Sequence, residues 1–274
     1  MSEAAATQPR LTLWAALKEI GWLPLLLMGI GGLSIIDLLE TAVFGELDLI
    51  TPFRIVVDGY QRISALIGAL AERPLAPVIA WLSELMTIDL TLQPYWRSLF
   101  LLQAIAVTPI VRSTWGAGER IDAVIAAVVM YLGCLLVSLL FGLAPSIPAW
   151  WFQGFVAAIM VLTIWLTFGV AAALGPAGKD EPVQVGAGIA MASFCAALTF
   201  VIAAGLAFVP QVGSGAAVMA FGLFIAAFGL LFIWIAFRGS EDNLQTFRMG
   251  FGIFGGFIAA ALVLIADGVV KAFS

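Results

Sequence analysis

Long apolar segments, each about the length that crosses a lipid bilayer, make up most of this chain. They cover residues 20–39, 95–115, 121–143, 151–174, 186–209, 215–237 and 247–268. An α-helix rises about 1.5 Å per residue, so about 20 apolar residues span a hydrocarbon core roughly 30 Å thick. The 274-residue chain is 63% hydrophobic and only 11% charged, whereas soluble proteins average about 25% charged residues. The sequence therefore predicts an all-α, polytopic transmembrane bundle of about seven spans, with residues 1–274 forming one membrane domain.

A long charged interval separates the first predicted span from the second. From Asp37 to Tyr95 there are eight carboxylates and three arginines, which gives a formal charge of 3 − 8 = −5. The whole chain also carries −5, so its other charges balance. We therefore predict that residues 40–94 form an acidic segment outside the cytoplasm or at the membrane interface.

The middle of this segment has the pattern of an amphipathic helix. Apolar residues recur there at three- and four-residue steps, with polar residues between them: Val56, Tyr60, Ile63, Ile67 and Leu70. We expect Pro74 and Pro77 to end this helix and to start a second one over about 75–86. Two arrangements fit the pattern equally well. The helices lie in the outer membrane interface, or they form a small hairpin that packs on itself.

The distribution of cations predicts how the chain is oriented. Short cytoplasmic loops carry an excess of Lys and Arg. If the N-terminus is cytoplasmic, most of the cations outside the acidic segment fall on the inner side: Arg10, Lys18, Arg112, Arg120, Lys179, Arg238 and Arg248. Nine arginines against three lysines are typical of GC-rich bacterial genomes. We therefore predict a multi-pass protein of a bacterial inner membrane, with a periplasmic C-terminus and with a cysteine at position 64 accessible from outside.

Few ionisable or strongly polar residues fall inside the predicted spans. Asp37 and Asp267 lie near the outer ends of the first and last spans, and Glu40 follows the first. These three carboxylates are candidates for an acidic outer mouth, and the alternative is anchoring at the interface. In the second span, Gln103, Thr108 and Arg112 are candidates for a polar pathway or for hydrogen bonds between helices.

Small residues at four-residue spacing mark candidate helix contacts. Gly252, Gly256 and Ala260 lie on one face of the last span, and Gly222 with Ala226 offers a similar face in the preceding one. Such spacing lets two helix backbones approach closely. The contact it predicts lies within one chain or, alternatively, between subunits.

The composition disfavours most catalytic functions. The chain has no histidine, and no nucleotide-binding or hydrolase motif is present, so we predict no enzymatic activity, no cofactor and no bound metal. It has no basic stripe for nucleic acid. We expect a non-catalytic subunit or scaffold of a membrane complex, which contacts the lipid bilayer and a protein partner or further copies of itself. The alternative is a channel or passive transporter for a cation or a small solute.

Overall fold

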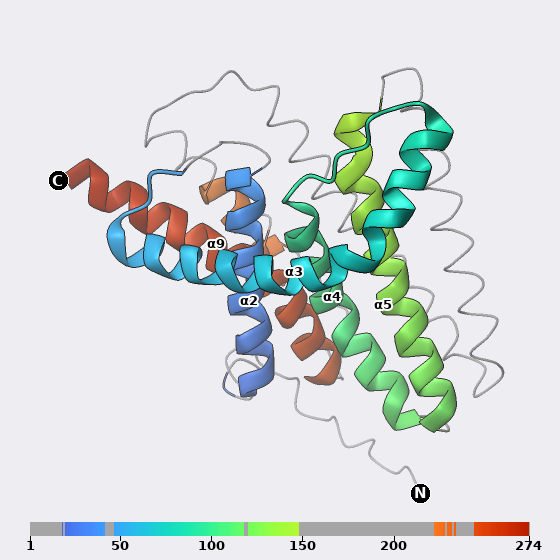
Figure 1. The fold of residues 1–274 in the computed structure, drawn as a ribbon. Helices are drawn as coiled ribbons and strands as arrows, with labels where there is room; N and C mark the ends of the chain where they lie inside the picture. The colour runs from blue at the N-terminus through green and yellow to red at the C-terminus, as the bar shows by residue number, and fades with distance from the viewer. Residues whose placement is uncertain are drawn as a thin grey trace, which may run out of the picture.

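The structure, a computed structural model, describes residues 18, 20–41, 47–117, 120–147, 222–227, 229–231, 233 and 244–273. All regular secondary structure in these ranges is helical, which confirms the all-α prediction for them. The elements are α2 (Trp22–Leu39), α3 (Thr51–Met86), α4 (Trp96–Ala117), α5 (Arg120–Leu143), the 3₁₀ helix η2 (Ala144–Ser146) and α9 (Leu244–Phe273). α4 and α5 form an antiparallel hairpin beside α2, and α9 crosses behind α2 (Figure 1).

Four helices in the described ranges are long and apolar enough to cross a membrane: Trp22–Leu39, Thr51–Met86, Ala127–Ser146 and Phe254–Phe273. Three of them overlap the predicted spans 20–39, 121–143 and 247–268. The fourth is α3, whose pattern predicted a surface helix. α4 covers the predicted span 95–115 but is not among the four. The predicted spans 151–174 and 186–209 lie outside the described residues and 215–237 is described only in part, so the count of seven stays a prediction.

The contact between α2 and α9 is the most extensive helix contact in the described ranges. Gly31 and Gly32 of α2 face Gly256 of α9, and a Cβ atom on Gly256 would lie only 3.0 Å from the carbonyl carbon of Gly31. Ala260 is fully buried one turn further along α9. Close backbone approach of this kind requires small side chains on both helices.

The other small-residue candidates lie on or next to the same helix. A Cβ atom on Gly222 would lie 3.1 Å from side-chain atoms of Leu264 and Ile265 in α9, and Ala226 packs against the core that includes Leu264. Gly252 lies in α9 one turn before Gly256. Gly222, Ala226, Gly256 and Ala260 therefore pack against helices of the same chain, and whether subunits also meet through small residues stays a prediction.

α3 is one continuous helix of 36 residues that contains Pro74 and Pro77 in its interior. The prediction that these prolines end one helix and start another is therefore wrong. Each proline removes one backbone donor and crowds the carbonyl four residues earlier, which bends a helix without ending it when the flanking turns stay bonded. Figure 1 shows the change of direction in the C-terminal part of α3. The helix ends at Met86 and is followed by Thr87, which takes a left-handed conformation with φ 55°.

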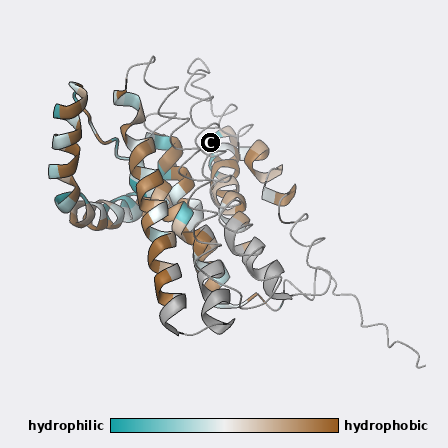
Figure 2. Ribbon diagram, turned by 90° about the vertical axis from the view of Figure 1, so that its right-hand side faces the viewer, coloured by the Kyte–Doolittle hydropathy of each residue, from teal (hydrophilic) through white to brown (hydrophobic). Residues whose placement is uncertain are grey.

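α3 also crosses the bundle instead of running along it. It passes over α2 and α4 and contacts both (Figure 1). In Figure 2 it lies to the left of the upright helices and shows hydrophilic and hydrophobic residues in alternation. Four of the five residues that identified the helix in the sequence point away from the bundle, since Val56, Ile63, Ile67 and Leu70 are all about half exposed or more, whereas Tyr60 points toward α2 and α4. Three of its polar residues, Arg54, Gln61 and Glu72, meet the ends of α2 and α4.

Candidate functional site

Polar side chains from three helices meet where α3 crosses α2 and α4. We call this group the polar junction, and it consists of Ser34, Asp37, Glu40, Arg54, Asp58, Tyr60, Gln61 and Ser98. Two of its carboxylates are almost completely buried, with Asp37 6% and Glu40 4% exposed. Buried carboxylates are stable only when their oxygen atoms are hydrogen-bonded or paired with a cation. The junction supplies both.

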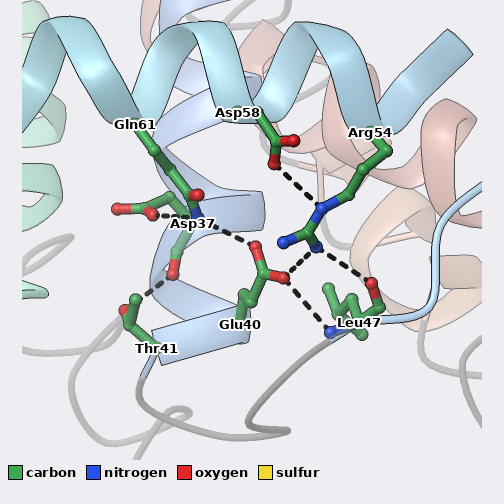
Figure 3. Close-up of polar contacts among 7 residues, drawn as sticks. All are labelled: Asp37, Glu40, Thr41, Leu47, Arg54, Asp58 and Gln61. Atoms are coloured by element: carbon green, nitrogen blue, oxygen red, sulfur yellow. Dashed lines mark hydrogen bonds and ion pairs between the residues drawn. The ribbon is translucent and has the colours of Figure 1, made fainter. Parts of the chain in front are cut away.

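Glu40 is the ion-paired carboxylate of the junction (Figure 3). Its Oε1 atom accepts a hydrogen bond from Arg54 Nη1 and a longer one, 3.3 Å, from the backbone N–H of Leu47. Arg54 also donates to the Leu47 carbonyl at 3.1 Å and pairs with Asp58, one turn further along α3, at 2.9 Å. Arg54 therefore links the first turn of α3, the end of α2 and the segment that connects them.

Asp37 is held by neutral donors. Gln61 Nε2 lies 2.9 Å from Asp37 Oδ1 and also 2.9 Å from Glu40 Oε2, so this one amide group satisfies both carboxylates with its two hydrogens. Ser98 Oγ, from α4, donates to Asp37 Oδ2. Asp37 thus connects α2 with α3 and α4 at a single point.

Tyr60 and Ser34 extend the junction along α2. The Tyr60 hydroxyl lies 2.7 Å from Ser34 Oγ, and Ser34 Oγ donates to the Ile30 carbonyl at 2.9 Å. Because a serine hydroxyl has one hydrogen, Tyr60 is the donor in its contact with Ser34. Ser64, one turn after Tyr60, is buried and donates to the Gln61 carbonyl. Position 64 faces the bundle, so it is a poor site for the accessible cysteine that the sequence suggested.

The start of α3 is attached to the far end of α9. Asp267, only 2% exposed, accepts the backbone N–H of Ile50 at 2.7 Å and pairs with Lys271 at 3.1 Å. Lys271 also lies 3.5 Å from Asp48. Residues 47–50 are therefore held by Glu40 of α2 and by Asp267 of α9.

A second ion pair holds the later part of α3 on α4. Glu72 Oε1 accepts hydrogen bonds from Trp96 Nε1 at 2.9 Å, Arg97 Nε at 3.0 Å and Arg97 Nη2 at 2.6 Å. The side chain of Arg97 crosses α3 at Gly68, where a Cβ atom would overlap it. A glycine at position 68 is therefore what lets Arg97 reach Glu72.

No protein-family model, curated protein or solved structure matches this chain. The functional proposal therefore rests on the sequence and the geometry of this chain. In the described ranges, no three His, Cys, Asp or Glu side chains gather as a group that could hold a metal ion.

The structure does not bring the three predicted mouth carboxylates together as one open group. Asp37 and Glu40 share the amide of Gln61, whereas Asp267 pairs with Lys271 at the end of α9. All three carboxylates are buried, and their oxygen atoms accept hydrogen bonds from other groups of the protein. Sequence reasoning missed their partners, above all Arg54, Gln61 and Ser98. The pattern places Gln61 among the polar residues between the apolar ones, but it does not indicate what the polar face of the helix contacts.

Two of the three polar candidates in the predicted second span, Gln103 and Thr108, contact α5. Thr108 Oγ1 donates to the Ala104 carbonyl at 2.6 Å and lies 3.0 Å from the Tyr131 hydroxyl of α5. Arg112 lies further along α4, and its side chain is outside the described residues. The structure thus places Thr108 in the α4–α5 contact.

Gln103 is buried in the same contact, with 5% of its surface exposed. Its Oε1 atom lies 3.1 Å from Ser138 Oγ, which also lies 2.7 Å from the Cys134 carbonyl. With this orientation, Gln103 Nε2 has no acceptor in the described part of the chain. Turning the amide by half a turn lets Nε2 donate to Ser138 while Ser138 donates to Cys134, which uses each hydrogen once. In either orientation, one end of this buried amide points away from Ser138.

Proposed function

We propose that the chain is a multi-pass protein of a bacterial inner membrane that acts as a non-catalytic subunit or scaffold of a membrane complex. In this proposal α3 is a fixed helix at the outer membrane interface. One observation carries the proposal: polar contacts attach α3 to α2, α4 and α9, while its apolar face points away from the protein.

The outward face of α3 supports its placement in the interface. Nine large apolar side chains on it are between 49% and 68% exposed: Ile55, Val56, Ile63, Leu66, Ile67, Leu70, Val78, Trp81 and Leu85. Burying one such side chain contributes about 1.5–3 kcal/mol, so a continuous row of nine is strongly unfavourable in water. A helix with one apolar face and charged edges is suited to lie in the plane of a membrane interface.

The bonding of the buried carboxylates favours a structural role over a catalytic one. The carboxylates of Asp37, Glu40 and Asp267 each accept a hydrogen bond from a side chain or backbone group of another segment. Buried ion pairs add little net stability, but removing one partner is costly, so they select one arrangement of the helices. A scaffold needs such a defined arrangement, because it must present the same surface to its partner.

The experiment is extraction of the protein from native membranes with its surrounding lipid, followed by mass measurement and identification of bound proteins. We expect a stoichiometric partner or a homo-oligomer. The double variant Glu40→Gln/Glu72→Gln should reduce partner recovery by loosening α3, whereas Glu84→Gln, on an exposed part of α3, serves as the matched control. Recovery of a monomer without any partner would contradict the proposal.

A channel or passive transporter for a cation or small solute is the second candidate, and the buried amide of Gln103 favours it. The end of this amide that points away from Ser138 has no partner among the described residues, so it can hydrogen-bond to a polar solute that passes it. If this function holds, Gln103→Leu should abolish flux into liposomes while leaving the thermal unfolding temperature nearly unchanged. The absence of flux with the unmodified protein would exclude it. Asp37→Asn is a poor probe, because the structure predicts that it also disturbs the polar junction.

A further inference from the structure

Two exposed arginines of α3 lie on one edge of the helix before its bend. Arg62 and Arg73 are eleven residues apart, and eleven residues make about three turns. Their side chains therefore project from nearly the same side of the helix axis, and both are exposed. The apolar residues Val56 and Ile67, also eleven apart, belong to the outward face beside this edge.

The two arginines of this edge are available for an external anion. Arg54 and Arg97 are paired with carboxylates of this chain, whereas Arg62 and Arg73 have no ion-pair partner among the described residues. Eleven residues of helix put these two arginines about 16 Å apart along the axis, too far for one phosphate to bridge them. Each would need an anion of its own.

We propose that α3 binds anionic phospholipids, with the headgroup phosphates at Arg62 and Arg73 and the acyl chains along the apolar face. This inference rests on the placement of α3 at the membrane interface in the proposed function. Two observations favour lipid over a protein helix as the occupant. Large apolar side chains are exposed on both sides of the bend at Pro74 and Pro77, and flexible acyl chains can follow a bend that a straight helix cannot. The cations also adjoin the apolar face, as an amphiphile with a charged head requires.

The test measures which lipid contacts this face. A fluorophore is attached at Leu66→Cys, which is 68% exposed and one turn from Arg62, in a chain whose Cys134 and Cys195 are replaced by alanine. The labelled protein is reconstituted in vesicles that contain a brominated phosphatidylglycerol or a brominated phosphatidylcholine, and quenching by each lipid is compared. A fluorophore at Leu262→Cys, on the exposed face of α9, reports ordinary lipid contact as the control.

A cation near an anionic membrane should enrich anionic lipid about fivefold. We therefore expect about fivefold preference for phosphatidylglycerol at position 66 and none at position 262. Arg62→Gln/Arg73→Gln should remove the preference but keep the quenching, and Arg62→Lys/Arg73→Lys should keep both. Inorganic phosphate in the buffer should not displace the lipid.

Three outcomes would overturn the inference. The first is no quenching at position 66 by either lipid, which would mean that protein or water covers the face. The second is a lipid preference that survives in the glutamine variant, and the third is displacement of the lipid by inorganic phosphate, which would indicate a site for soluble anions. A monomeric protein without a partner would refute the scaffold function but would leave these quenching results standing, so the two failures are distinguishable.

Discussion

Replacing Gly32 by alanine should push α2 and α9 apart. A Cβ atom at position 32 would lie 2.7 Å from the Cβ of Ala259, 3.2 Å from the backbone nitrogen of Ala260 and 3.3 Å from the carbonyl oxygen of Gly256. Carbon atoms in contact normally lie about 3.5–4.0 Å apart, so the helices would have to separate by roughly 1 Å. Gly29, on the same helix, has no atom within 4 Å of its hypothetical Cβ and serves as the matched control.

The two substitutions should change the free energy of unfolding in opposite directions. Alanine in place of a helical glycine contributes about 0.5–1 kcal/mol when there is room for the methyl group. Overpacking a close contact costs about 1–3 kcal/mol. Gly29→Ala should therefore raise stability slightly and Gly32→Ala should lower it. The helix gain is common to both variants, so their difference is the overpacking cost of about 1–3 kcal/mol. For a chain of this size that corresponds to roughly 2–12 °C in the midpoint of unfolding.

Thermal unfolding in mild detergent, followed by tryptophan fluorescence, measures this difference. The second substitution Ala259→Gly should restore part of the loss in Gly32→Ala, because it removes the nearest atom but leaves two backbone atoms in place. Equal midpoints for Gly29→Ala and Gly32→Ala would show that α2 and α9 do not approach as closely as the structure indicates.

Three further predictions concern α3. Glu72→Ala and Arg97→Ala should each lower the temperature midpoint of unfolding. The double-mutant cycle should give a coupling free energy of about 1 kcal/mol between the two residues. A coupling free energy near zero would mean that their ion pair does not hold α3 on α4. Gln61→Leu removes the donor shared by two buried carboxylates and should lower the free energy of unfolding by about 2–3 kcal/mol in the same assay, so an unchanged value would contradict the polar junction. In intact bacteria, an impermeant thiol reagent should label Glu84→Cys from outside and Gly178→Cys only after the inner membrane is opened, and the reverse pattern would invert the topology.

The helices of the described bundle were largely predictable from sequence, because the residues within each helix are enough to predict that it forms. A run of about 20 apolar residues predicts a membrane-length helix whatever packs against it, and α2, α5 and α9 follow that rule. The interior of α3 was harder. Proline lowers helix stability by a known amount, but whether a helix bends or breaks there depends on contacts made elsewhere. Here the Glu72 and Arg97 pair fixes α3 on α4 just before Pro74.

The orientation of α3 could not be read from its pattern. Hydrophobic periodicity shows that a helix has two different faces, but not which of them meets the protein. In water the apolar face turns inward, whereas in a membrane lipid can cover it and polar side chains can form the contacts between helices. The partners of the buried carboxylates were equally hidden, because they lie far away along the chain. Ser98 is 61 residues from Asp37, and Ile50 is 217 residues from Asp267. Asp37 and Asp267 were still found, since a carboxylate near the end of a span is conspicuous in any apolar sequence.

The contacts of α3 also change the meaning of the acidic interval. Five of its eight carboxylates make ion pairs or hydrogen bonds within the chain: Asp37, Glu40, Asp48, Asp58 and Glu72. Two of the cations that pair with them, Arg97 and Lys271, lie outside the interval. Most of these acidic side chains therefore take part in contacts within the chain. They attach a long helix to the bundle by its polar side, and the exposed side chains of α3 include its apolar face, Arg62, Arg73 and Glu84.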